Sequence, residues 1–317
     1  MVLALAACSG GTNADDKNTD SSEDTYTIGV LYLDQEVLLS EATAGCQAYA
    51  AEHSNVKLIE YNANKDVSTQ LKQCENLISQ NVDAIALTPV DGAGCDQIIN
   101  ACKDAGIPLI CFHAKVNGAP ITNILFDNVG FGKMQVDYAM EIFEKNGGDM
   151  NGTINVGIVT GKLDNQNAVE RCQGYEEQLK NYANATIVDE QVGSWNRDDA
   201  MAIAENWITS GRDIDIILSN NDAMAIGISL AYANANVERP IIIGVGGTEE
   251  GLTAILNGDF DGTVFQPAYQ NGYDAIDFTV KYLNGETLEE SYVTEGVLVT
   301  PETAQATLDD LNAMLNS

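Results

Sequence analysis

Short apolar segments alternate with amphipathic segments along most of this chain, beginning at Tyr26. The short segments have the length of buried strands, whereas the longer ones repeat apolar residues every three or four positions, as helices do. Thr27 to Leu33 is the first predicted strand, and Leu38 to His53 is the first predicted helix. Strands that alternate with helices in this way predict parallel sheets connected by right-handed crossovers.

The same alternation continues to the end of the chain. The predicted strands are residues 27–33, 56–61, 84–89, 108–112, 121–126, 154–159, 185–192, 214–219, 240–245, 262–265 and 294–299. The predicted helices are residues 38–53, 67–79, 95–103, 131–144, 168–181, 198–209, 223–235, 252–256 and 269–283. A terminal helix follows, with Thr300 as its cap and Pro301 in its first turn.

A break at Gly147 and Gly148 separates two successive sets of strands and helices. The chain has 317 residues, which exceeds the size at which a single hydrophobic core usually stops growing. The sequence therefore predicts an α/β protein with two similar Rossmann-like lobes, each built on a parallel sheet.

The charge of the chain excludes one class of partner. It has 47 acidic and 15 basic residues, which gives a net charge of -32. A polyphosphate would be repelled by this field, so we expect no nucleic-acid partner. Because 45% of the residues are apolar, the acidic excess indicates a soluble globular protein and not a disordered one.

The first residues resemble the end of a bacterial lipoprotein signal. Leu5-Ala6-Ala7-Cys8 matches a lipobox, and the polar stretch of residues 9–25 that follows cannot form a core. We expect residues 1–8 to be the remnant of the signal and residues 9–25 to be a flexible tether. The resemblance implies that Cys8 carries the lipid, so we expect an extracytoplasmic protein anchored to the membrane, on a Gram-positive cell surface in preference to a periplasm.

The remaining six cysteines do not form any C-x-x-C pair, so the sequence does not support zinc or thioredoxin-like chemistry. They are either buried thiols or include a disulfide that the sequence does not assign. These residues are Cys46, Cys74, Cys95, Cys102, Cys111 and Cys172.

Motifs for catalysis and cofactors are missing. The segment from Gly244 to Glu249 follows a predicted strand, but Glu249 takes the third glycine position of a dinucleotide fingerprint, where a carboxylate would repel a pyrophosphate. There is no G-x-S-x-G elbow, and His53 and His113 are the only histidines. We therefore expect no enzyme activity, no cofactor and no metal.

The junction from Ser219 to Asp222 points to a ligand site. It connects a short apolar run to a helical pattern, so it lies where a strand ends and a helix begins. In open α/β folds, ligands bind outside the carboxyl ends of the strands. The alternative interpretation is that Asn221 simply caps the helix.

Together these segments resemble a substrate-binding protein of the ribose and galactose type, the extracytoplasmic receptor of a sugar ABC transporter. The resemblance runs from about Thr27 to Val299. Its marks are Ile107-Pro108-Leu109-Ile110, Asp127-Asn128, Glu170-Arg171-Cys172-Gln173-Gly174-Tyr175, Ser219-Asn220-Asn221-Asp222, Gly244-Val245-Gly246-Gly247-Thr248 and Gly262-Thr263-Val264-Phe265-Gln266.

The resemblance implies a periplasmic binding protein of type I, with two lobes joined by three crossover segments. We place the crossings near Asp127, near Gln266 and between Tyr292 and Val297. The N-terminal lobe is then residues 26–127 plus 267–293, and the C-terminal lobe is residues 128–266 plus 294–317. A small ligand binds between the lobes, and the closed form delivers it to ABC permease subunits. We expect a monomer.

The resemblance also implies site residues. Asn221 matches the sugar-binding asparagine of the family, Gln266 matches its glutamine at a crossing, and Trp195 matches an aromatic residue that stacks on the sugar. His113 replaces part of an Asp-Arg pair, as either a pocket donor or a structural histidine. Further candidates lie just before the first helix: Tyr32, Asp34 and Glu36.

No arginine or lysine occupies the matched positions, which disfavours anionic ligands. We therefore expect a neutral sugar, a polyol or an amino sugar, since Asp34 and Glu36 would tolerate an amino group. A nucleoside or another heterocycle, stacked on Trp195, is the alternative. The effector-binding core of a LacI-type regulator shares the fold, but the lipobox argues against that function.

Overall fold

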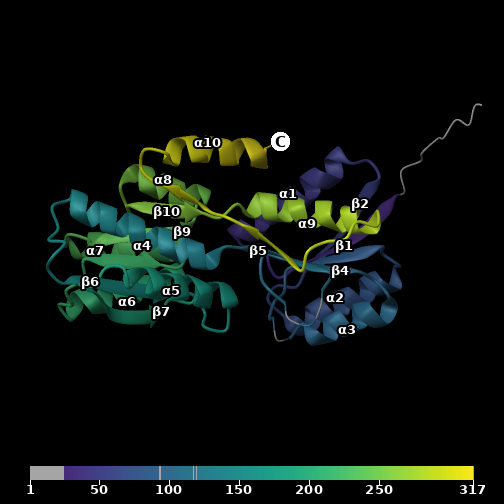
Figure 1. Cartoon of the computed structure of the whole chain (residues 1–317), viewed down its shortest axis with the longest axis horizontal. Coiled ribbons are helices and arrows are strands. Elements are labelled where there is room, and N and C mark those ends of the chain that lie inside the picture. The colour runs from purple at the N-terminus through teal and green to yellow at the C-terminus, as the bar shows by residue number, and fades with distance from the viewer. Residues whose placement is uncertain (1–24, 93, 117, 119, 317) are drawn as a thin grey trace, which may run out of the picture.

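The computed structural model describes residues 25–316 except 93, 117 and 119. It consists of two α/β lobes that lie side by side, each built around one six-stranded sheet (Figure 1). Within these described residues, no helix combines the length and the apolar character needed to cross a membrane.

The first lobe contains a sheet in the order β11-β5-β4-β3-β1-β2, and every neighbouring pair is parallel. Helices α1 and α9 pack on one face of this sheet and α2 and α3 on the other (Figure 1). The strands are β1 (Tyr26–Tyr32), β2 (Val56–Asn62), β3 (Ala84–Leu87), β4 (Leu109–Phe112), β5 (Thr122–Phe126) and β11 (Ser291–Thr294). The helices are α1 (Val37–Glu52), α2 (Val67–Ser79), α3 (Asp96–Ala105) and α9 (Ala268–Leu283).

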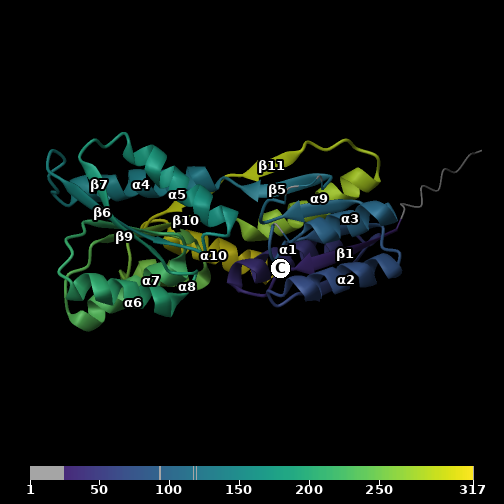
Figure 2. The ribbon, with the colours of Figure 1, turned by 90° about the horizontal axis from the view of Figure 1, so that it is seen from below.

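The second lobe repeats this plan in the order β12-β10-β9-β8-β6-β7, with β12 antiparallel to β10. Helices α4 and α5 cover one face, and α6, α7 and α8 cover the other (Figure 2), with α10 packed against α8. The strands are β6 (Ile154–Thr160), β7 (Ala185–Val192), β8 (Ile216–Ser219), β9 (Ile241–Gly246), β10 (Gly262–Phe265) and β12 (Val297–Val299). The helices are α4 (Asn128–Lys145), α5 (Gln166–Leu179), α6 (Arg197–Thr209), α7 (Asp222–Ala235), α8 (Glu249–Asn257) and α10 (Ala304–Leu315).

The chain passes between the lobes three times: from β5 to α4, from β10 to α9, and from β11 to β12. Each lobe is therefore built from segments that are distant in the sequence. The predicted fold class, two similar α/β lobes joined by three crossovers, is confirmed. The residue boundaries predicted for the lobes stay a prediction.

Two predictions near the C-terminus are wrong. The expected strand at 294–299 is two strands, because the chain leaves the first sheet after Thr294 and joins the second at Val297. The terminal helix begins at Ala304 and is not capped by Thr300. The carbonyl of Thr300 instead closes a turn, accepting hydrogen bonds from the backbone N–H groups of Thr303 and Ala304 at 3.0 and 2.9 Å.

Helices α1 and α9 approach each other closely at a pair of glycines. A Cβ atom on Gly45 would lie 1.9 Å from the carbonyl oxygen of Tyr269, and one on Gly272 would lie 1.9 Å from that of Ala42. These neighbours are backbone atoms, which cannot rotate away as a side chain can. Only glycine therefore allows this contact, which attaches the helix after the second crossing to the first lobe.

We expect Gly272→Ala to destabilise the protein by about 1–3 kcal/mol, because the added methyl group overpacks a backbone contact. Urea denaturation followed by circular dichroism measures the change. Gln270→Ala, on the exposed side of the same helix, is the control and should leave the midpoint nearly unchanged. Equal urea midpoints for both variants would show that α1 and α9 can move apart without loss of stability, which would contradict this prediction.

Candidate functional site

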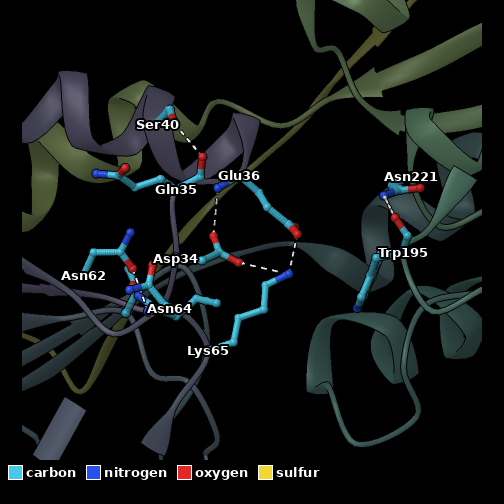
Figure 3. A network of polar contacts seen from close by, with 11 residues as sticks. Asp34, Gln35, Glu36, Ser40, Asn62, Asn64, Lys65, Trp195 and Asn221 are labelled. Carbon is cyan, nitrogen blue, oxygen red and sulfur yellow. Dashed lines mark hydrogen bonds and ion pairs between the residues drawn. The ribbon is translucent and has the colours of Figure 1, made fainter. Parts of the chain in front are cut away.

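The residues predicted for ligand binding come from loops of both lobes. Figure 3 shows Asp34, Glu36 and Lys65 of the first lobe on one side, with Trp195 and Asn221 of the second lobe opposite them. These residues follow strands β1, β2, β7 and β8, so they lie at carboxyl ends of parallel strands. Ligands of open α/β folds bind at this edge.

Trp195 is held in an uncommon backbone conformation. Both Ser194 and Trp195 have positive φ angles, 54° and 66°, and the next residue, Asn196, caps α6. The indole ring lies against the backbone of Gly161, where a Cβ atom would come within 2.2 Å of the ring. Non-glycine residues in this region carry strain and cluster at functional sites. The loop thus fixes the position of a flat aromatic face.

Asn221 is both a helix cap and a neighbour of Trp195. Its Oδ1 accepts a hydrogen bond from the backbone N–H of Met224 at 2.9 Å, which caps α7. Its Nδ2 donates to the backbone oxygen of Trp195 at 3.3 Å (Figure 3). The preceding Asn220 is fully buried and accepts from the backbone N–H of Gly161 at 3.0 Å. The capping role expected as an alternative is therefore present, and it also ties Asn221 to the Trp195 loop.

Gln266 is oriented by a buried arginine. Arg171, only 3% exposed in α5, donates from Nη2 to the Oε1 of Gln266 at 2.6 Å. It also donates from Nε to the Oδ1 of Asn128 at 3.0 Å, and from Nη1 to the backbone oxygen of Asn220. Its guanidinium carbon lies 5.6 Å from the ring centroid of Trp195. These contacts leave the amide nitrogen of Gln266 as the group that can donate to a ligand.

Burial lowers the pKa of Arg171 to about 10, so the guanidinium still carries its charge at neutral pH. The sequence presented Arg171 only as part of a family motif and gave no sign of this role. Its three acceptors come from α4, the end of β8 and the second crossing, and a sequence pattern cannot bring such distant segments together.

His113 lies at the end of β4 with a positive φ of 70°. Its backbone oxygen accepts from the Nδ2 of Asn167 at 3.3 Å, which links the first lobe to α5 of the second. Its Nδ1 is a buried atom with no hydrogen-bond partner among the described residues. Burial, helped by the nearby charge of Arg171, lowers the pKa of His113 to about 4. The imidazole is therefore neutral at pH 7 and keeps one polar atom for a further partner.

Asp34 and Glu36 form a charged cluster with a residue that the sequence interpretation missed. The ammonium of Lys65 lies 3.3 Å from the Oδ2 of Asp34 and also pairs with Glu36 (Figure 3). Burial acts against its charge, but the hydrogen bond and charge of Glu36, followed by those of Asp34, outweigh it and raise the pKa of Lys65. One cation is thus shared between two carboxylates.

Lys65 could have been identified as a site residue by aligning the two halves of the chain with each other. Asn64 and Lys65 have positive φ angles and precede Asp66, the cap of α2. Ser194 and Trp195 occupy the same two positions before α6 in the second lobe. Lys65 and Trp195 are therefore structural equivalents.

Tyr32 is separated from these residues. It is only 2% exposed, and its hydroxyl donates to the Oε1 of Glu60 at 2.8 Å. Its ring packs edge-on against Phe112 inside the first lobe. At the end of a buried strand, Tyr32 therefore points into the core, and we leave it out of the site.

Glu41 is a buried carboxyl group near the boundary between the lobes. It lies on α1 and is 3% exposed, and its Oε2 has no hydrogen-bond partner among the described residues. Burial, and then the charge of Asp222 in the second lobe, raise the pKa of Glu41 to about 8. Asp222 itself accepts hydrogen bonds from the hydroxyl of Thr263 at 2.6 Å and the backbone N–H of Thr248 at 3.0 Å.

We expect Glu41→Gln to weaken the pH dependence of stability. Between about pH 4.5 and pH 8 the folded protein keeps the Glu41 proton that the unfolded chain loses, so stability falls as pH rises. This contribution is at most about 1.4 kcal/mol per pH unit. Urea unfolding at pH 5.5 and pH 7.5 measures it. Glu75→Gln, at an exposed carboxylate of α2, is the control, and an equal pH dependence in both variants would contradict this assignment.

Metal chemistry has no candidate residues here: within the described part of the chain, no three His, Cys, Asp or Glu side chains form a group that could hold a metal ion. The site is instead a set of amide, carboxylate, ammonium and indole groups contributed by two lobes. Such a set can bind hydroxyl groups and cover the apolar face of a ring.

Comparisons with known proteins show which family the chain is related to. The chain is 30% identical over 309 residues to a xylitol-binding protein of Mycolicibacterium smegmatis, covering 97% of this chain and 83% of the relative. It is 26% identical over 295 residues to a galactofuranose-binding protein of Escherichia coli, covering 89% and 90%. An ABC transporter solute-binding protein from Bacillus halodurans, solved with bound myo-inositol, superposes with a TM-score of 0.81 at 29% identity, covering 91% of this chain and 99% of that one. Residues 30–287 match the model of the periplasmic binding protein domain, and the chain belongs to this family.

Proposed function

We propose that this protein captures a neutral polyol or sugar between its lobes and delivers it to an ABC importer. The proposal rests on two different groups of side chains that face each other from equivalent positions of the two lobes. One is the indole of Trp195, and the other is the Asp34–Lys65–Glu36 cluster. The indole covers the C–H face of a ring or carbon chain, while the charged cluster and the amides of Asn221 and Gln266 bind hydroxyl groups.

The charges near the site support a neutral ligand. Lys65 is already paired with two carboxylates, and the three acceptors of Arg171 orient its guanidinium within the protein. A ligand carboxylate or phosphate would meet Asp34 and Glu36 without an unpaired cation of its own. The relatives named for xylitol, galactofuranose and myo-inositol have neutral ligands of this chemical class.

A binding role without catalysis is part of the same proposal. The family consists of ligand-binding transport proteins. The polar side chains of the site are held in place by helix caps, ion pairs and amide hydrogen bonds. Side chains fixed in this way can orient the hydroxyl groups of a ligand. A nucleoside stacked on Trp195 is the second candidate, favoured by the flat aromatic ring of this partly exposed residue.

We expect xylitol, myo-inositol or a related neutral sugar to raise the melting temperature in a thermal-shift screen. A ligand at about 100 times its dissociation constant stabilises the folded state by roughly 2.7 kcal/mol. Trp195→Ala should abolish the shift because the apolar wall is lost. Leu230→Ala, which truncates an exposed apolar side chain on α7, is the control and should keep the full shift.

Three outcomes discriminate between the candidates. A shift with nucleosides alone would favour the heterocycle over the polyol. A shift with a sugar phosphate or sugar acid would overturn the charge argument. A polyol shift that survives in Trp195→Ala would show that the pocket lies elsewhere.

The membrane attachment is a further part of the proposal, and it rests on the lipobox. Cys8 and the tether of residues 9–25 lie outside the described residues, apart from Thr25. Relatives of this chain include periplasmic binding proteins, which agrees with an extracytoplasmic location. We propose that a lipid on Cys8 holds the two lobes at the cell surface of a Gram-positive organism.

We expect Cys8→Ser to move the protein from the membrane fraction into the medium while its ligand-induced thermal shift is unchanged. Immunoblots of both fractions from a Gram-positive host measure the distribution. Cys172→Ser, a partly exposed cysteine of α5, is the control and should stay with the membrane. Retention of Cys8→Ser in the membrane fraction would remove the lipid-anchor assignment.

A further inference from the structure

Four of the cysteines gather in one apolar cluster of the first lobe. They lie on α2, before and within α3, and on β4, and each is buried. They are Cys74, Cys95, Cys102 and Cys111. Buried thiols are ordinary as small apolar side chains, so burial alone does not distinguish any of them.

Two of these thiols are in contact. The Sγ atoms of Cys74 and Cys102 lie 3.6 Å apart, and the two side chains are 0% and 1% exposed. Cys74 projects from α2 and Cys102 from α3, two helices that pack on the same face of the first sheet (Figure 1). A disulfide has a sulfur–sulfur distance of about 2.05 Å, so an approach of roughly 1.5 Å would form it.

We propose that Cys74 and Cys102 are joined by a disulfide in the exported protein. The family to which the chain belongs has members that work in the periplasm, and disulfides form and persist in such compartments. The two residues are 28 positions apart, so the bond would close a loop that spans the end of α2, β3 and most of α3. Closing this loop restricts the unfolded chain and stabilises the folded lobe.

The oxidant is the disulfide of a thiol–disulfide oxidoreductase or of glutathione. The thiolate of one cysteine attacks that disulfide and forms a mixed disulfide, and the oxidant's first sulfur leaves as a thiol. The thiolate of the second cysteine then attacks the protein sulfur and releases the second thiol of the reduced oxidant. Two protein thiols lose two protons and two electrons in total, and the oxidant takes up both.

The bond must form before the lobe is fully packed. In the folded lobe neither sulfur is accessible, and the hydrogen bond with Cys102, followed by burial, raises the pKa of Cys74. The thiolate that attacks a disulfide is therefore scarce once α2 and α3 are in place. Oxidation is expected during folding and not after it.

The test is to refold the reduced full-length chain with a mixture of oxidised and reduced glutathione. Free thiols are then alkylated under denaturing conditions and the peptides are mapped by mass spectrometry. We expect a cross-linked peptide pair containing Cys74 and Cys102 in the majority of molecules. The same oxidant added to the reduced protein after folding should leave both thiols free.

Cysteine variants and the melting temperature of the oxidised protein test whether Cys74 and Cys102 are the bonded pair. Cys102→Ser should abolish the cross-link, whereas Cys95→Ser, a matched buried cysteine of the same cluster, should retain it. The oxidised wild-type protein should melt at a higher temperature than the reduced one. Alkylation of all the cluster thiols after oxidative refolding, or a cross-link that uses Cys95 or Cys111, would overturn the proposal. The peptide map of the wild-type protein tests the Cys74–Cys102 disulfide even if a variant does not fold.

Discussion

The buried guanidinium of Arg171 is the interaction on which the arrangement of the site depends. A charge removed from water is costly unless hydrogen bonds replace its hydration. Arg171 finds these bonds on Asn128, just after the first crossing, on Gln266 at the second crossing, and on the backbone oxygen of Asn220. The need to satisfy one cation thus fixes two connections between the lobes relative to the end of β8.

Pairs of glycines attach the helices that follow the first two crossings. Gly132 of α4 and Gly174 of α5 allow these helices to touch through their backbones, since a Cβ atom on either would come within 2.2 Å of a carbonyl oxygen. The pair Gly45 and Gly272 does this for α1 and α9. Helices α4 and α9 follow the first and second crossings, so each of these two crossings leads directly into a helix that is closely packed in its lobe.

Much of the fold could be predicted from the sequence, because the alternation of apolar runs and helical patterns is a local signal. Contacts between distant segments could not be predicted in this way. Tyr32 ends an apolar strand, and periodicity does not tell whether its ring faces the core or the other lobe. Arg171 bonds to residues 43, 49 and 95 positions away. The contact of Cys74 with Cys102 depends on how two helices lie on a sheet, and the turn at Thr300 resembles a helix start in sequence alone.

The equivalence of Lys65 and Trp195 makes the two lobes chemically different at corresponding positions. Two lobes with the same residue at this position would enclose a site with two-fold symmetry, in which a ligand could enter in either of two reversed poses. Here one lobe presents an indole and the other a salt-bridged ammonium, so the two lobes are not equivalent at this position. A difference at one pair of corresponding positions thus removes the two-fold symmetry that two identical lobes would have.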